Sequence, residues 1–131
     1  MFVDASAFCA VLLREEGYEV FERKLAEGSG LMTSPIGVWE TVRGVVRETG
    51  VEVAAAQSVV EAYMAETEIR LVQVGGAELE LALAAMSRFG KGRHPARLNM
   101  GDCFAYACAR SHGAPLLFKG DDFTKTDVPA A

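Results

Sequence analysis

The sequence opens with the stretch FVDASAFCAVLL, residues 2–13, in which a few residues typical of a strand run directly into an apolar helical segment. Phe2 and Val3 indicate the end of a short buried strand that closes at Asp4. Ser6 is a favourable N-cap residue, so we predict a helix over residues 7–13. A strand followed at once by a helix is the first unit of an α/β fold.

The same alternation continues along the chain. Apolar residues at helical spacing run up to Gly28, and further helices are predicted over residues 35–49, 51–67, 77–89 and 102–112. Further strands are predicted over residues 31–33, 70–74 and 115–118. We therefore expect one α/β domain spanning residues 1–131, with a central parallel sheet of four to five short strands and helices on both faces.

Two of the predicted helices are adjacent and should form a hairpin. Pro35 suits the first turn of the earlier helix, and Gly50 suits the C-cap that separates the two. The second helix has an apolar stripe formed by Val59, Val60, Tyr63 and Met64.

Composition excludes several classes of protein. The chain has 13 Lys and Arg against 18 Asp and Glu, a net charge of −5, which argues against binding nucleic acid through a generally positive surface. Its three cysteines, Cys9, Cys103 and Cys108, include no C-x-x-C pair, so buried reduced thiols are expected rather than disulfides or zinc. The longest apolar run is too short to cross a membrane and no signal peptide is evident, so we expect a cytoplasmic protein.

Acidic residues follow the predicted strands, at the sheet edge where ligands bind in such folds. Asp4 ends the first strand, Asp102 opens the last helix, and Asp121 and Asp122 follow the fourth strand. Each of them alone could be a cap or turn residue, and Asp102 is the clearest candidate for an N-cap. Glu40 is harder to explain in that way, because it follows Ile36, Val38 and Trp39 in a segment composed to be buried.

A cluster of these carboxylates would need a cation. Two carboxylates about 5 Å apart repel by roughly 3 kcal/mol at an effective dielectric near 20. Oxygen ligands alone favour Mg²⁺ or Mn²⁺ over zinc. His94 and His112 are expected to have local roles, so they do not alter this preference.

Basic residues gather in one irregular stretch, residues 90–97. Lys91, Arg93 and Arg97 precede Asp102 closely and are candidates for contacts with RNA phosphates. A solvated surface loop is the alternative explanation. Lys119 is a second candidate for a phosphate contact.

Four segments together resemble a PIN-domain ribonuclease of the VapC toxin type: VDAS at residues 3–6, VWE at 38–40, GRHPARLNMGDC at 92–103 and LLFKGDDF at 116–123. The resemblance implies an endoribonuclease that hydrolyses RNA phosphodiester bonds with Mg²⁺ (or Mn²⁺). It implies four catalytic acids, Asp4, Glu40, Asp102 and Asp122. Of these, Asp4, Asp102 and Asp122 would bind metal, and the supporting polar residues are Ser6, Asn99 and Asp121.

The sequence leaves the roles of several site residues open. Glu40 could bind metal or position the attacking water, and the site could hold one ion or two. Phe118 departs from the family pattern, in which many members carry Thr or Ser, so no hydroxyl contact is expected there.

A catalytically inactive PIN-like module that binds RNA or protein is the alternative function. A receiver-type signalling domain is disfavoured, because Ala5 stands where a second acid would follow Asp4.

The resemblance also implies protein partners. A cognate antitoxin would bind in a groove on the helices of residues 36–67, although core packing is the commoner use of such apolar stripes. We expect an amphipathic antitoxin segment that directs an Arg at the acids, since a cation there can replace the charge of the metal. The family further implies a homodimer.

Overall fold

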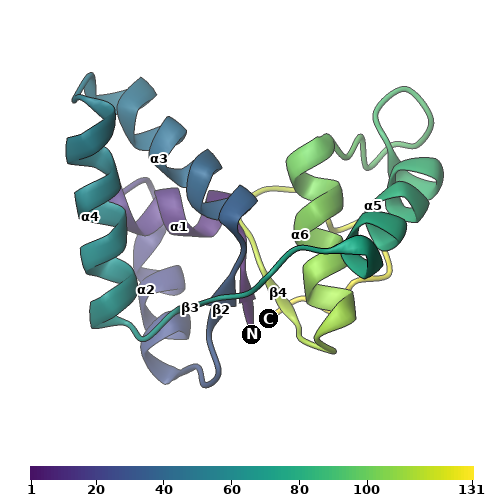
Figure 1. Cartoon of the computed structure of the whole chain (residues 1–131), viewed down its shortest axis with the longest axis horizontal. Coiled ribbons are helices and arrows are strands. Elements are labelled where there is room, and N and C mark those ends of the chain that lie inside the picture. Colours follow the sequence, from purple (N-terminus) through teal and green to yellow (C-terminus); the bar gives the residue numbers. More distant parts are fainter.

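The computed structural model describes residues 1–131, and its elements alternate as the sequence predicts. Their order is β1 (Phe2–Val3), α1 (Ala5–Leu12), α2 (Tyr18–Glu27), β2 (Met32–Thr33), α3 (Pro35–Thr49), α4 (Val53–Glu66), β3 (Arg70–Leu71), α5 (Gly76–Phe89), α6 (Met100–Ser111) and β4 (Leu116–Leu117). Figure 1 shows the short strands at the centre of the molecule and the helices around them.

The four strands form one parallel sheet in the order β3-β2-β1-β4. Phe2 of β1 pairs with Met32 on one side and Leu116 on the other, so β1 lies inside the sheet. A single parallel bridge between Leu116 and Ala130 extends the pairing beyond β4 in place of a fifth strand. The predicted fold class is confirmed.

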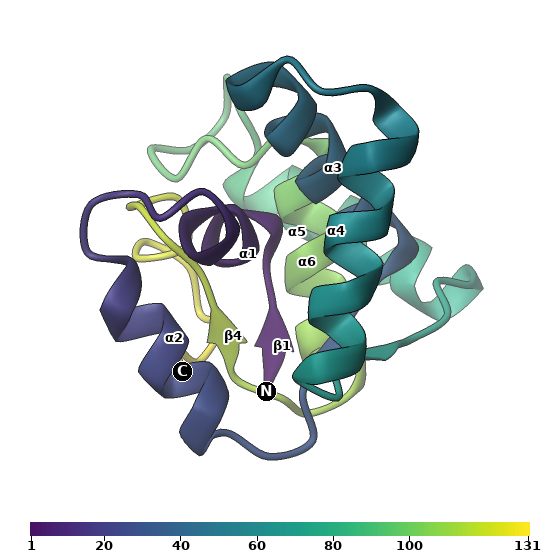
Figure 2. The ribbon, with the colours of Figure 1, turned by 90° about the vertical axis from the view of Figure 1, so that its left-hand side faces the viewer.

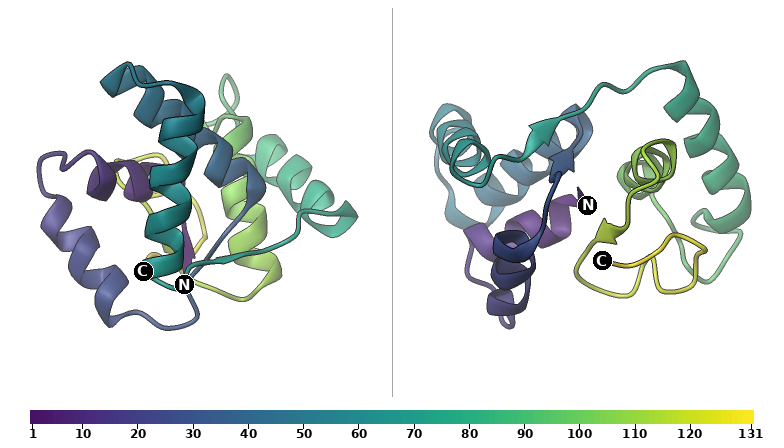
Figure 3. Two further views of the ribbon diagram at one scale, coloured as in Figure 1. Left: turned by 60° about the vertical axis from the view of Figure 1, so that its left-hand side comes forward. Right: turned by 90° about the horizontal axis from the view of Figure 1, so that it is seen from below.

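Helices cover both faces of the sheet because successive strand residues point in opposite directions. Phe2 and Leu116 pack into a core cluster with residues of α5 and α6. Val3 and Leu117, the next residue of each strand, pack into a second cluster with residues of α1, α2 and α4. Figures 2 and 3 show the two groups of helices on opposite sides of the strands.

Two predicted helix starts are wrong by a few residues, because the caps are other side chains. Asp4, not Ser6, caps α1: its Oδ2 accepts the Ser6 backbone N–H at 2.9 Å, and the helix begins at Ala5. Asn99, not Asp102, caps α6, which begins at Met100. Both acids therefore lie at helix starts, where backbone N–H groups favour negative charge.

The hairpin of α3 and α4 forms as predicted, with Gly50 at φ 73° as the C-cap of α3. Its apolar pattern differs in two places. Val60 is buried but Val59 is 49% exposed, so Val59 does not belong to the core stripe. Trp39 is 62% exposed, so the expectation of a buried segment around Glu40 is wrong at that residue.

The remaining differences are local. The third strand covers only residues 70–71, because β3 is an exposed edge strand that pairs on one side alone. All three cysteines are free, with Cys103 and Cys108 buried and Cys9 half-buried. Every helix is too short or too polar to span a bilayer.

Candidate active site

A pocket of about 330 Å³ opens at the carboxyl edge of the sheet, where the ends of β1 and β4 meet the helices α1, α3 and α6. It contains three of the four predicted catalytic acids together with several basic side chains. Its lining residues are Asp4, Ala5, Ser6, Cys9, Glu15, Glu40, Arg43, Gly44, Arg47, Asp102, Lys119 and Gly120. We call it the acid pocket.

Asp4 is buried at the end of β1 and is fixed by Ser6. The Ser6 hydroxyl donates to Asp4 Oδ2 at 2.5 Å, and its backbone N–H donates to the same oxygen at 2.9 Å. The Ser6 hydroxyl also accepts the backbone N–H of Lys119 at 3.0 Å. Ser6 therefore ties the start of α1 to the segment after β4 and orients Asp4 between them.

Asp102 is held by a reciprocal cap at the start of α6. Asn99 Oδ1 accepts the Asp102 backbone N–H, and Asp102 Oδ2 accepts the Asn99 backbone N–H, both at 2.9 Å. Such a capping box satisfies two N–H groups that a helix start leaves free. It also restricts the rotation of the Asp102 carboxylate, which explains the supporting position of Asn99.

Glu40 reaches the acid pocket from the second turn of α3 and packs directly against α6. A Cβ atom at Gly101 would lie only 2.0 Å from Glu40 Oε1. The absence of a side chain at residue 101 therefore allows the Glu40 carboxylate to lie next to the start of α6 and close to Asp102.

Asp122 differs from the other three acids because it is exposed in the loop after β4 and does not line the acid pocket. Its charge nevertheless raises the pKa values of both Asp4 and Asp102, so it lies near them. Asp121 is exposed, and its backbone carbonyl accepts hydrogen bonds from Thr124. No contact places the Asp121 carboxylate at the pocket.

Burial and mutual repulsion raise the pKa values of these carboxyl groups above their ordinary range. Burial raises the pKa of Glu40 to about 7, and the charges of Asp4 and Asp102 add to the effect. Burial likewise raises the pKa of Asp102 to about 6, against the Asn99 hydrogen bond. Burial raises the pKa of Asp4 as well, although its hydrogen bonds with Ser6 oppose the shift. Burial is the largest cause in each case, and Arg43 is the only basic residue whose charge opposes these shifts, so the carboxylates are incompletely balanced.

Two basic residues of the pocket were missed from the sequence. Arg43 and Arg47 lie three and seven positions after Glu40, a spacing that places all three on one face of α3. Helical periodicity counted from Glu40 would have found them. The charge of Arg43 partly opposes the rise in the Glu40 pKa.

The predicted phosphate contacts lie in two different places. Lys119 lines the acid pocket and pairs with Glu15, with 2.5 Å between Nζ and Oε2. Lys91, Arg93 and Arg97 instead line a separate pocket of about 460 Å³ within their own loop. In Figure 1 this loop projects beside α5 and α6, away from α3. His94 accepts the Ala96 N–H within it, which is a local role.

The donor set of the acid pocket fits a hard divalent cation. No three acidic, histidine or cysteine side chains form a compact metal-binding group in this structure, so three direct ligands to one ion are not assembled. Mg²⁺ commonly needs only one or two direct carboxylates and keeps several waters. The incompletely balanced carboxylates of Asp4, Glu40 and Asp102 meet that requirement.

Comparison with known proteins identifies the family of the chain. The family model described as PIN domain matches residues 1–129. The chain therefore belongs to the PIN-domain family, and the predicted resemblance is confirmed.

The relatives define a narrower group. A VapC ribonuclease from Rhizobium meliloti is 35% identical over 139 aligned positions, which cover 97% of this chain and 98% of that protein. Ribonuclease VapC from Mycolicibacterium smegmatis is 37% identical over 130 positions, which cover 99% of this chain and 98% of that protein. These nearly full-length matches place the chain among the VapC ribonucleases.

Solved structures share the fold. Mycobacterium tuberculosis VapC20, a sarcin-ricin loop cleaving toxin, superposes with a TM-score of 0.79 at 21% identity and covers 99% of this chain and 97% of its own. A toxin-antitoxin complex from Klebsiella pneumoniae gives a TM-score of 0.69 at 15% identity, and the match covers 99% of this chain and 95% of the chain in that structure.

Proposed function

We propose that this protein is a metal-dependent endoribonuclease that hydrolyses RNA phosphodiester bonds at the acid pocket. The observation that carries the proposal is the convergence of Asp4, Glu40 and Asp102, with Asp122 nearby, from four separate segments of the chain. A module that only bound RNA would gain nothing from incompletely balanced carboxylates facing an anionic ligand. The VapC relatives, which are named as ribonucleases, support the same activity.

Asp4 and Asp102 would hold the metal directly, and the nearby Asp122 would hold it through a coordinated water. A bound Mg²⁺ or Mn²⁺ would lower the pKa of a water and neutralise charge on the phosphoryl oxygens. Ser6 keeps Asp4 oriented toward this site and Asn99 does the same for Asp102.

The other residues of the pocket act on the substrate. Glu40, which packs against Gly101, would orient the attacking water and accept its proton. Arg43 and Arg47 are placed to bind the phosphates beside the scissile bond. Lys119 can add a further contact when its pairing with Glu15 opens. Asp121 keeps the supporting role that the family resemblance implies.

The decisive experiment compares the wild type with Asp4→Asn and Asp102→Asn on an RNA stem-loop in Mg²⁺, in Mn²⁺ and with EDTA. We expect the wild type alone to cleave the RNA, and only when a metal is present. Glu80→Gln removes an exposed acid on α5 and serves as the matched control, with cleavage unchanged. Equal cleavage by all variants would show that the activity comes from another site or another nuclease.

We also propose that a cognate antitoxin inhibits the enzyme. Support comes from the Klebsiella pneumoniae neighbour, which is a toxin-antitoxin complex, and from the open acid pocket, which an Arg of a partner could enter. The amphipathic antitoxin segment expected from the sequence would then cross the α3–α4 hairpin. A bound antitoxin that left the carboxylates open and metal-loaded would contradict this arrangement.

A homodimer would use a different surface, the apolar pocket of about 310 Å³ between α5 and α6. Leu79, Leu83 and Met86 are each about half-exposed on α5, at the helical spacing of a contact face. We expect Leu83→Glu to halve the mass measured by light scattering, whereas Val20→Glu, at a similarly exposed site on α2, leaves it unchanged. A monomeric wild type would contradict the assignment.

A further inference from the structure

Trp39 is the one tryptophan of the chain, and it is 62% exposed. Tryptophan usually buries most of its large apolar surface in a core or an interface. Trp39 instead lies on the first turns of α3, directly before the catalytic candidate Glu40. An exposed indole at that position calls for a ligand or partner that covers it.

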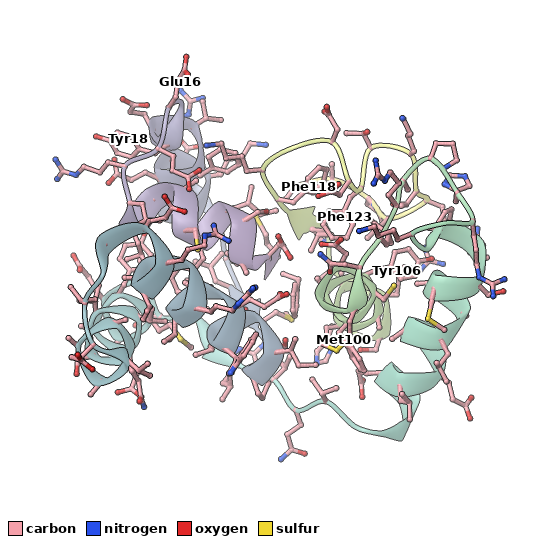
Figure 4. The ribbon with its side chains drawn as sticks, turned by 90° about the horizontal axis from the view of Figure 1, so that it is seen from above. Glu16, Tyr18, Met100, Tyr106, Phe118 and Phe123 are labelled. Carbon is pink, nitrogen blue, oxygen red and sulfur yellow. The ribbon has the colours of Figure 1, made fainter.

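The indole borders a small apolar pocket of about 310 Å³, lined by Pro35, Ile36, Trp39 and Met100. Met100, which is also 62% exposed, is the first residue of α6, and Figure 4 shows it beside that helix. The pocket therefore spans the starts of α3 and α6. We call it the Trp39 pocket.

The Trp39 pocket and the acid pocket are lined by neighbouring residues of the same two helices, α3 and α6. Glu40 follows Trp39 on α3, and Gly101, against which the Glu40 carboxylate packs, follows Met100 on α6. An RNA strand with one phosphate in the acid pocket would thus bring a neighbouring nucleotide beside Trp39, since adjacent nucleotides are covalently linked.

Charge at the rim favours a nucleotide over a protein side chain. The Arg43 guanidinium lies over the indole, with Cζ 5.8 Å from the ring centroid, and Arg43 also lines the acid pocket. A nucleotide combines an aromatic face for Trp39 with a phosphate for Arg43. Aromatic side chains that stack unpaired bases are a common device of RNA recognition.

We propose that the Trp39 pocket binds an unpaired nucleobase of the RNA substrate, next to the phosphate that is cleaved. This inference rests on the proposed nuclease function and deepens it, because it assigns one residue of this chain to the base next to the cleaved phosphate. Trp39 is a substrate-binding residue in this scheme, with Met100 and Ile36 as the apolar walls around the base.

The single tryptophan makes the proposal directly measurable. In an Asp102→Asn background, which does not cut, we expect a short single-stranded RNA to quench Trp39 fluorescence until the site is saturated. The same RNA with an abasic nucleotide at the bound position should still bind, through its phosphates, but should no longer quench. Stacking contributes enough that Trp39→Ala should weaken binding of a labelled RNA by about 5- to 150-fold, whereas Trp39→Phe retains most of it.

Val53→Ala is the matched control, because Val53 is 60% exposed at the start of α4, outside both pockets. It should bind the labelled RNA as the wild type does.

Three outcomes would overturn the proposal in different ways. If the wild type cleaves RNA but its fluorescence is not quenched and Trp39→Ala binds RNA normally, base binding is overturned and the nuclease function stands. Absence of both cleavage and RNA binding would overturn the function itself. Met100 also lines the α5–α6 pocket, so emission that changes with protein concentration in the absence of RNA would assign the indole to a contact between two copies and overturn the proposal.

Discussion

Glu40 illustrates the free-energy cost of gathering buried carboxylates at one site. Its pKa is raised to about 7 by burial and by the neighbouring charges of Asp4 and Asp102, and Arg43 offsets only part of that shift. Without metal, ionisation of Glu40 near neutral pH therefore opposes folding. A bound divalent cation would remove this cost, so the metal and the folded state should stabilise each other.

The first prediction is that metal-free protein loses stability as pH rises from about 4.5 to about 7. A carboxylate whose pKa is higher in the folded state holds its proton longer there, so its stabilising contribution is complete below the unfolded pKa and is lost as pH passes the folded value. Thermal unfolding with EDTA should show Tm falling more steeply for the wild type than for Glu40→Gln. Mg²⁺ should restore Tm at neutral pH, and identical pH profiles for the two proteins would contradict the assignment.

At the scale of elements, the starts of α1 and α6 and the second turn of α3 form the site. Asp4 caps α1, and Asp102 takes part in the capping box of α6, so two catalytic candidates also complete the hydrogen bonds of helix starts. The two uses are compatible, because a capping carboxylate keeps further lone pairs for another ligand. The close approach of α3 to α6 at Gly101 then sets the position of Glu40 relative to Asp102.

The second prediction concerns that approach. In Gly101→Ala the new Cβ would meet the Glu40 carboxylate, which ends a flexible side chain and can move aside. We expect Tm to stay level or rise, because Ala is favoured over Gly in a helix by about 1 kcal/mol. Cleavage should nevertheless fall by roughly 100-fold, the order expected when a reacting group is displaced by about 1 Å.

Gly76→Ala is the control for this variant. Residue 76 lies at the start of α5 and a Cβ there would have no neighbour within 4 Å. It adds the same methyl group to a helix and should leave cleavage unchanged. Full activity in Gly101→Ala would show that the position of Glu40 does not depend on the contact between α3 and α6.

At the scale of the whole molecule, the net charge of −5 is divided between the site and the rest of the chain. The acid pocket, together with the neighbouring Asp122, has five acids and three bases, which leaves 13 acids against 10 bases on the rest of the chain. The rest of the chain therefore has a modest net charge of −3. RNA can be bound locally by the arginines of α3 and by the loop of residues 90–97, without a generally positive surface.

The third prediction separates these two sources of binding. Each phosphate contact contributes about 0.7 to the slope of log affinity against log salt for a single strand. In the Asp102→Asn background, Arg47→Gln should lower that slope by about 0.7, and joint replacement of Lys91, Arg93 and Arg97 by Gln should lower it by about 2. Arg70→Gln, on edge strand β3, should leave it unchanged. A slope unaffected by Arg47→Gln would remove α3 from the RNA path.

The sequence by itself determined the α/β class, the order of the elements and the set of candidate acids. Alternating apolar strands and periodic helices are local signals, and short stretches such as VDAS and KGDDF can be recognised without knowledge of the fold. Helix starts were less certain, because several neighbouring residues such as Asp4 and Ser6 can each cap, and only the backbone geometry selects one.

Tertiary structure alone decided which side chains share a pocket. Helical spacing puts Arg43 and Arg47 on the same face of α3 as Glu40, but only the packing of α3 against α1 and α6 makes that face line the acid pocket. The loop that contains Lys91 extends beside α5 instead. Trp39 is exposed, although its neighbours in sequence are apolar, because it lies on the face of α3 away from the core. Such contacts depend on how distant segments pack, and no short stretch of sequence encodes the position of its neighbours in space.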